Sequence, residues 1–200
     1  MNNRFFITKA IKNSREVKGK ILEDEEILTT IEKIVDEIIK AFNNDKKLLF
    51  CGNGGSAADA QHIAAELSGK FYLDREPLFA EALHVNTSFL TAVANDYSYD
   101  EVFSRAVKAM GRKGDVLIGI STSGSSLNVI KALEVANIMG MITIGFTGNS
   151  GGKMKNLCQF LIKVPSTDTA RIQESHILIG HIICEIVEKE IFGSKDIKKI

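Results

Sequence analysis

Apolar residues recur at helical spacing through the first quarter of the chain. In the later part of this stretch they occupy positions 27, 31, 34, 35, 38, 39 and 42, which is the i, i+4, i+7, i+8 pattern of an amphipathic helix. A second stripe, at positions 5, 6, 10 and 11, can be continued by residues 17–22. We therefore predict two helices within residues 3–43, with a break near Lys18-Gly19-Lys20. The wide apolar stripe of the second helix needs a partner, which is either the domain core or another subunit. Because the stripe of residues 21–43 is larger than an added arm on a complete domain needs, it predicts a homo-oligomer.

From residue 47 the pattern changes to short apolar runs separated by longer segments of helical character. Short apolar runs that alternate with helices are typical of a parallel sheet covered on both faces. The pattern therefore predicts an α/β fold, a three-layer sandwich of the flavodoxin-like or Rossmann-like kind with an N-terminal helical arm. We expect strands at 47–51, 115–120, 141–146 and 160–164, a weak strand near 82–85, and helices at 57–69, 87–94, 99–110, 127–139 and 169–192.

The segments that connect these elements do not divide the chain into separate domains. Residues 70–79 are expected to form a loop, and Asp168 or Thr167 is a suitable N-cap for the last helix. There is no internal repeat, low-complexity tract or linker. Residues 1–200 are accordingly predicted to form a single domain.

The charge balance and the cysteines limit the kinds of partner and the cellular location expected for the protein. Lys and Arg together number 25, as do Asp and Glu, so nothing in the balance calls for a nucleic acid or membrane partner. The three cysteines are isolated and odd in number, which argues against a disulfide framework and favours a reducing, cytoplasmic location.

A Gly-rich loop, Gly52-Asn-Gly-Gly-Ser56, follows the first predicted strand. It lacks bulky side chains, so its backbone can approach a ligand closely, and the free N–H groups of the helix after it point toward it. The spacing Gly52-x-Gly54-x-x-Ala57 also satisfies a loose dinucleotide fingerprint. That interpretation is the weaker one, because the fingerprint requires an acidic residue at the end of a second strand, where residues 69–76 indicate a loop.

A second polar loop, Ser121-Thr-Ser-Gly-Ser-Ser126, lies between the strand at 115–120 and the helix at 127–139. Five hydroxyl groups and a glycine at a helix N-terminus form an anion cradle without fixed charge. N-capping and turn formation would account for one or two of the hydroxyls, whereas five favour phosphate binding. Ligands of parallel sheets bind at the carboxyl ends of the strands, and both polar loops are expected there.

His62 and Glu66 stand four residues apart, on one face of the helix that follows the first loop. An imidazole and a carboxylate arranged in this way can hold a divalent metal or share a proton transfer. A phosphate-binding loop beside such a pair suggests an enzyme that acts on a small phosphorylated molecule.

The last helix carries polar residues within an apolar sequence. His181 is expected to be buried and so needs polar partners, and Gly180 beside it would let another backbone approach closely. Helical geometry leaves the partner of His181 open: Glu174 is better aligned, while Gln173 is rotated by roughly 80°. Cys184 could ligate zinc, but its apolar neighbours favour an inert core thiol.

Four segments together resemble the phosphoheptose isomerases, a family of bacterial sugar-isomerase (SIS) domain enzymes. The resemblance covers nearly the whole chain. It rests on the run from Cys51 to Leu67, on Ala94-Asn-Asp-Tyr97, on Ser121–Ser126 and on the run from Ser166 to His181.

The resemblance implies an aldose–ketose isomerase that converts sedoheptulose 7-phosphate to D-glycero-D-manno-heptose 7-phosphate. This is the first step toward activated heptose for lipopolysaccharide core or related surface glycans. It further implies one zinc ion per subunit and a cytoplasmic homotetramer. A weaker alternative within the superfamily is a non-enzymatic SIS protein that binds a sugar phosphate and regulates replication initiation.

The resemblance also assigns site residues. It implies that the zinc ligands are His62, Glu66, Gln173 and His181, which favours Gln173 over Glu174. Among these, we expect Glu66 to be the catalytic base and His181 the acid, because isomerisation needs a base near C1 and C2 and an acid near the oxygens. Substrate contacts are implied for Asn53, Gly54, Gly55, Glu66, Asn95, Asp96 and Gln173, with the phosphate on Ser121, Thr122, Ser123 and Ser126.

Overall fold

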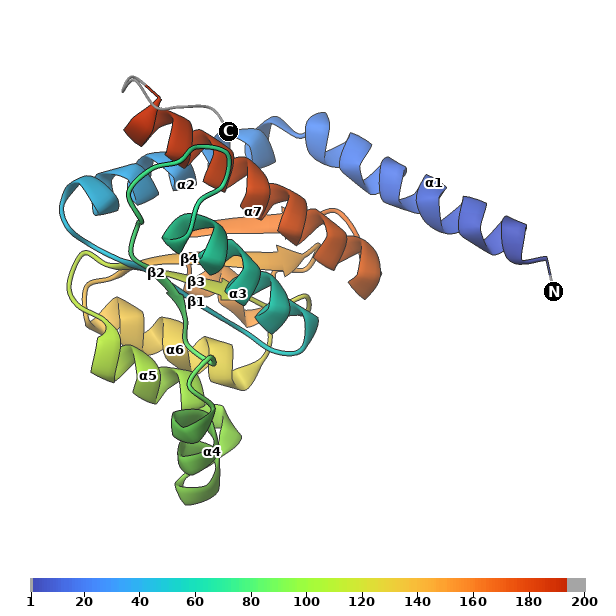
Figure 1. The fold of residues 1–200 in the computed structure, drawn as a ribbon. Coiled ribbons are helices and arrows are strands. Elements are labelled where there is room, and N and C mark those ends of the chain that lie inside the picture. The colour runs from blue at the N-terminus through green and yellow to red at the C-terminus, as the bar shows by residue number, and fades with distance from the viewer. Residues whose placement is uncertain (1, 194–200) are drawn as a thin grey trace.

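The computed structural model describes residues 2–193, so residue 1 and residues 194–200 of the predicted domain lie outside the described residues. Within this range the chain forms a five-stranded parallel sheet between two layers of helices (Figure 1). The strand order β2-β1-β3-β4-β5 is the flavodoxin-like order. The predicted α/β fold is thereby confirmed.

The elements follow the predicted order, and most ends shift by only a few residues. The weak strand was wrongly predicted near 82–85, because the segment that pairs with Leu48–Phe50 is residues 80–82, and the 3-10 helix at 152–156 was not predicted. The strands are β1 (Leu48–Gly52), β2 (Ala80–Ala82), β3 (Val116–Ile120), β4 (Ile142–Gly148) and β5 (Phe160–Val164). The α-helices are α1 (Asn3–Leu22), α2 (Glu25–Asn43), α3 (Gly55–Ser68), α4 (Thr87–Asp96), α5 (Val102–Met110), α6 (Leu127–Ile138) and α7 (Thr169–Phe192), and the 3-10 helices are η1 (Tyr99–Glu101) and η2 (Gly152–Asn156).

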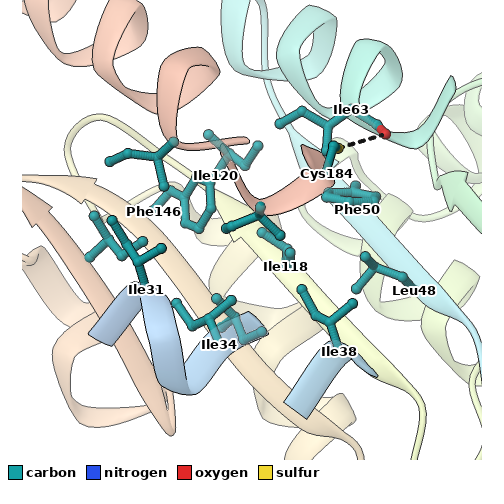
Figure 2. Packing of buried hydrophobic residues seen from close by; sticks show 14 of the residues in the cluster. Ile31, Ile34, Ile38, Leu48, Phe50, Ile63, Ile118, Ile120, Phe146 and Cys184 are labelled. Carbon is teal, nitrogen blue, oxygen red and sulfur yellow. Dashed lines mark hydrogen bonds between the residues drawn. The ribbon is translucent and has the colours of Figure 1, made fainter. Parts of the chain in front are cut away.

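The two faces of the sheet are buried by different helices. Successive strand residues point to opposite faces, so Leu48 and Phe50 of β1 join one core cluster while Leu49 joins the other. The first cluster lies beneath α2, α3 and α7, where Ile34 and Ile38 of α2 meet the strand residues (Figure 2). The second cluster is covered by α5 and α6. Burial on both faces explains why the central strands β1 and β3 have no polar side chains and are buried at every position.

The break between the first two helices lies later than predicted. Helix α1 runs through Gly19 to Leu22, and α2 begins after Asp24, whose carboxylate accepts hydrogen bonds from the N–H groups of Glu26 and Ile27 at 3.0 and 3.1 Å. A glycine inside a helix costs only about 1 kcal/mol, so Gly19 does not end α1. The N-cap at Asp24 is the signal that locates the break.

The apolar stripe of α2 is buried along its length, whereas that of α1 is buried only near its C-terminal end, at Val17 and Ile21. The stripe of α2 is buried within the chain, with Ile34 and Ile38 fully inaccessible, so the domain core is its partner and the stripe gives no support to the predicted oligomer. Helix α1 extends away from the body of the domain (Figure 1), and Phe5, Phe6 and Ile11 on it are 53–65% exposed.

Among the helices of residues 2–193, none has the length and apolar character needed to cross a bilayer.

A histidine is buried where α7 packs on β4. His176 has no exposed surface, its Nε2 lies 3.1 Å from the carbonyl oxygen of Thr147, and its ring contacts Phe146. Burial lowers the pKa of His176 to about 4, and the contact with the Thr147 carbonyl offsets this only in part. The imidazole is therefore neutral in the folded protein at neutral pH.

This histidine should make stability depend on pH. In the unfolded chain its pKa returns to about 6.5, so the unfolded state binds an extra proton and stability is lost as the pH falls from about 6.5 to 4. His176→Gln keeps an N–H donor for Thr147 but cannot titrate. Between pH 7 and 4 the unfolding free energy of the wild type should fall by about 3 kcal/mol more than that of His176→Gln, as measured by urea titration. Parallel pH curves for the two proteins would contradict this assignment.

Candidate active site

The first Gly-rich loop connects β1 to α3 at the carboxyl edge of the sheet. Gly54 has a φ of +56°, which favours glycine, and it precedes the first residue of α3, Gly55. The helix thus begins two residues earlier than the predicted start at Ala57. In its first turn the N–H groups of Ser56 and Ala57 donate to the carbonyl oxygens of Asn53 and Gly54 at 3.0 and 3.1 Å, and the dipole at this end of the helix favours an anionic ligand.

Asn53 is held by two residues that the sequence analysis did not identify. Its amide pairs reciprocally with that of Asn128 on α6, with both N–H···O distances at 2.9 Å, and the Tyr99 hydroxyl donates to the Asn53 oxygen at 3.1 Å. Asn128 is buried and also accepts from the N–H of Val129. The sequence contained a signal for this role of Asn128. It is a polar residue among apolar neighbours at the start of a predicted helix, and a buried amide needs hydrogen-bond partners.

The second loop, between β3 and α6, gathers three of its hydroxyl groups. The Ser121 hydroxyl lies 2.9 Å from that of Ser126 and 3.4 Å from that of Ser123. Ser126 is the N-cap residue of α6, yet within the described residues its side chain makes no capping hydrogen bond. Capping therefore does not account for this hydroxyl cluster, which remains available to an anion at the helix start.

Contacts from the last residue of β4 and from the segment after it determine the backbone shape of this second loop. Gly124 has a φ of +63°, and a Cβ there would lie 2.3 Å from the carbonyl oxygen of Gly151. The Thr122 carbonyl accepts from the N–H of Gly148 at 3.0 Å, and the Gly124 carbonyl accepts from the N–H of Met154 at 3.1 Å. The hydroxyls are thus presented by a loop whose backbone is already fixed.

His62, Glu66 and His181 come together where α3 packs on α7. One potential ligand atom from each lies within 4.8 Å of the other two. The Nε2 atoms of His62 and His181 are 2.9 Å apart, and His62 Nε2 is 3.3 Å from Glu66 Oε1. The His62 side chain is half exposed, and Glu66 and His181 are partly buried, so the group is open to small molecules. The expectation that His181 is buried was therefore wrong, because its ring lies at the open edge of the contact between the two helices.

The neighbouring residues Gln173 and Glu174 face different surroundings. The amide of Gln173 lies against Gly55, where a Cβ would come within 2.6 Å of its Nε2, so it borders the first loop. The Glu174 carboxylate instead pairs with Arg171 at 2.7 Å and with Lys18 of α1 at 3.7 Å. The two side chains therefore diverge, one toward the polar loop and one toward the N-terminal arm.

Asn95 and Asp96 lie at the end of α4, with exposed side chains that bond to each other at 3.0 Å. Their link to the first loop is indirect, through the following 3-10 helix η1, whose Tyr99 donates to Asn53. The structure therefore pairs these two residues with each other at the end of α4.

Two further side chains border the His62 group. Asp59 lies one turn before His62, and its Oδ2 has no hydrogen-bond partner among the described residues. Burial raises the pKa of Asp59, and the nearby His62 works in the opposite direction. Cys184 is fully buried, and burial raises the pKa of its thiol to about 12. The prediction that Cys184 is an inert core thiol agrees with this environment.

Comparison with protein families gives a match over most of the chain. The profile of the SIS domain family matches residues 11–148. This span includes both polar loops together with His62 and Glu66, but it ends before α7 and so excludes Gln173 and His181.

Full-length relatives extend the match through α7. The chain is 57% identical to phosphoheptose isomerase from Clostridium acetobutylicum, with 95% of this chain and 97% of the relative covered. It is 54% identical to that from Aneurinibacillus thermoaerophilus, at 95% and 96% coverage. Among solved structures, phosphoheptose isomerase from Neisseria gonorrhoeae superposes with a TM-score of 0.89 at 41% identity, covering 94% of this chain and all of the other.

The amide pair between the two loops should contribute measurably to stability. Asn128→Ala removes both reciprocal bonds and leaves part of the Asn53 amide unpaired, so the unfolding free energy should fall by about 1–3 kcal/mol in urea titrations. Asn44→Ala is the matched control, because the Asn44 amide is exposed and makes one local bond to the Lys40 carbonyl. A loss in Asn128→Ala no larger than that in Asn44→Ala would show that the pair does not join the loops.

Proposed function

The chain belongs to the phosphoheptose isomerase family of SIS-domain proteins, and on that premise we propose that it converts sedoheptulose 7-phosphate to D-glycero-D-manno-heptose 7-phosphate. The observation that carries the proposal is the cluster of His62, Glu66 and His181 in a domain that also presents a neutral hydroxyl cradle. An aldose–ketose isomerisation uses both parts, one for proton transfer and one for the phosphate. The product serves as the precursor of activated heptose for lipopolysaccharide core or other surface glycans.

Glu66 and His181 are the proposed proton-transfer residues. The Glu66 carboxylate removes a proton from C1 of the ketose and returns it to C2, through an enediolate. His181 donates a proton to the oxygen on C2 and accepts the proton from the oxygen on C1, which leaves an aldehyde at C1 and a hydroxyl at C2. Atoms and charges balance over the cycle, and both residues end in their starting protonation states.

The donor set of the cluster fits a zinc ion. Two imidazole nitrogens and a carboxylate oxygen are ligands that zinc accepts, and the Nε2 atoms of His62 and His181 already face each other. Gln173 is the proposed fourth ligand, supported over Glu174 because the Glu174 carboxylate is engaged by Arg171 and Lys18. When bound, zinc would act as a Lewis acid toward the substrate oxygens. Glu66 has two carboxylate oxygens, so coordination through one leaves the other free as a base.

The two loops are the proposed substrate contacts. Asn53, Gly54 and Gly55 bind sugar hydroxyls, together with Asn95 and Asp96. The hydroxyls of Ser121, Thr122, Ser123 and Ser126 bind the phosphate at the N-terminus of α6, where the helix dipole also favours an anion.

A non-enzymatic SIS protein that binds a sugar phosphate and regulates replication initiation is the second candidate. Such a protein needs the hydroxyl cradle but has no use for two histidines and a carboxylate in contact. The isomerase is therefore the better supported of the two functions, and turnover of sedoheptulose 7-phosphate in a coupled assay distinguishes them.

We further propose that the protein is a cytoplasmic homotetramer. The exposed apolar residues of the projecting helix α1, among them Phe5, Phe6 and Ile11, provide a surface for a second copy. The three cysteines are free, which suits a reducing compartment. Light scattering that showed a stable 21.9 kDa monomer would exclude the oligomer.

Removal of the metal should abolish most of the activity. We expect a chelator to reduce turnover of sedoheptulose 7-phosphate and added zinc to restore it, with elemental analysis confirming the metal content. Gln173→Ala should lose metal affinity and activity, whereas Glu174→Gln should retain far more of both. Full turnover by metal-free protein would refute the zinc role, and an active Gln173→Ala beside an inactive Glu174→Gln would show that the wrong ligand had been assigned.

Replacement of the base should affect the chemical step. Glu66→Gln keeps the side-chain shape and an oxygen ligand but removes the basicity, so kcat should fall by roughly 10²–10⁴, the contribution of a general base. Circular dichroism should show an intact fold, and elemental analysis should show that zinc is partly retained. Turnover at the wild-type rate would exclude Glu66 as the base.

A further inference from the structure

A buried ion pair connects the end of α3 to α7, the two helices that carry the candidate proton-transfer residues. Arg75 belongs to the loop between α3 and β2, and Glu188 lies on α7, two turns beyond His181. Their Nε and Oε1 atoms are 3.0 Å apart, and the side chains are 0% and 2% exposed. An ion pair withdrawn from water persists only when its remaining polar atoms are also satisfied. The partners of both side chains therefore indicate what the pair holds in place.

The Glu188 carboxylate accepts four hydrogen bonds. Its Oε1 accepts from the N–H of Phe71 and from Arg75, both at 3.0 Å, and its Oε2 accepts from the N–H groups of Tyr72 and Leu73 at 2.7 and 2.9 Å. Burial raises the pKa of Glu188, but these four donors outweigh it and hold the pKa below the ordinary value. The charged carboxylate thus fixes three consecutive backbone N–H groups of the loop.

The Arg75 guanidinium binds the end of α3. It donates to the carbonyl oxygens of Glu66 at 3.0 Å, Leu67 at 2.7 Å and Gly69 at 3.1 Å. The last carbonyls of a helix have no partners within the helix, and a cation there also interacts favourably with the helix dipole. Arg75 therefore stabilises the turn of α3 that carries Glu66.

The loop fixed by Glu188 places an aromatic ring beside His181. The ring centroids of Phe71 and His181 are 5.7 Å apart with the planes inclined by 35°, and the Tyr72 ring covers Phe71 at 4.3 Å. His62 contacts the His181 ring at a centroid distance of 5.1 Å. The His181 imidazole thus lies between His62 and a ring whose backbone is held by Glu188.

We propose that Arg75 and Glu188 are positioning residues for the reaction: they hold Phe71 against the His181 ring and fix the end of α3 at Glu66. The pair thereby sets the orientation of both groups assigned to proton transfer without touching the substrate. This inference rests on the proposed function for its kinetic consequence, but the effect on the His181 ring is independent of that function. Partners that orient metal-ligating or catalytic groups typically contribute 10–100-fold to activity or metal affinity.

The kinetic test uses two substitutions that leave His181 and Glu66 unchanged. Glu188→Gln keeps the side-chain shape but replaces one acceptor oxygen with an NH₂ group, which opposes donors that were bonded. Phe71→Leu removes the ring and leaves the ion pair intact. Both should lower kcat by about 10–100-fold with KM changed by less than about threefold, because the lost contacts act on the catalytic groups. Phe79→Leu, the same change at an exposed phenylalanine that precedes β2, should match the wild type.

The second measurement follows the His181 ring directly. The chain has four histidines, so the ring signals of protein labelled with ¹⁵N at histidine can be resolved by NMR and that of His181 assigned by its loss in His181→Gln. Glu188→Gln should shift or broaden the His181 signals, whereas Phe79→Leu should leave them unchanged.

The outcomes separate positioning from simple stabilisation. Folded Glu188→Gln with wild-type kcat and unmoved His181 signals would overturn the inference, as would Phe71→Leu with wild-type kcat. If Glu188→Gln does not fold, Phe71→Leu decides, since its ion pair is intact. If wild-type protein fails to turn over sedoheptulose 7-phosphate, the proposed function fails, and the His181 signals of Glu188→Gln still test the positioning role.

Discussion

The close packing of α3 against α7 is the constraint on which the candidate site depends. At the level of His181 the contact is made by Gly180, where a Cβ would come within 2.4 Å of the buried side chain of Ile63. One turn further on, the Cys184 thiol meets the Ile63 carbonyl at 4.0 Å (Figure 2). Because the helices approach so closely here, His62 and His181 meet at 2.9 Å although 119 residues separate them.

The parallel sheet supplies the second constraint, which brings the two polar loops together. Strands β1 and β3 are neighbours, and Gly52 at the end of one is level with Ile120 at the end of the other. The segments that follow must therefore leave the sheet side by side, at the point where the strand order reverses. The Asn53–Asn128 amide pair then joins the loops, so that their relative position is set by the scaffold before any ligand binds.

The buried ion pair beside the contact between α3 and α7 is hydrogen-bonded in a way that also organises the site. The Arg75–Glu188 pair is buried, and its hydrogen bonds go to the backbone of the adjoining loop and to the end of α3. A buried charge must find such partners, because leaving it unpaired costs several kcal/mol. The same bonds that satisfy the pair hold Phe71 beside His181, so local stability and the geometry of the site have a common origin.

The sequence by itself determined the elements, because run length, periodicity and caps are local signals. It indicated the parallel sheet, the loops at its carboxyl edge and the pairing of His62 with Glu66, which needs only a spacing of four residues. The break predicted near Gly19 was wrong, because glycine is a weak helix breaker and the N-cap of the second helix is Asp24.

Only the tertiary structure decided which distant residues meet. Helix periodicity could not show which surroundings Gln173 and Glu174 face, because these are made by Gly55 and by Arg171 and Lys18. The roles of Asn128 and of the Arg75–Glu188 pair were hidden for the same reason. Their partners come from segments far along the chain. Contacts between such segments have no fixed separation in the sequence, so a sequence pattern cannot reveal them.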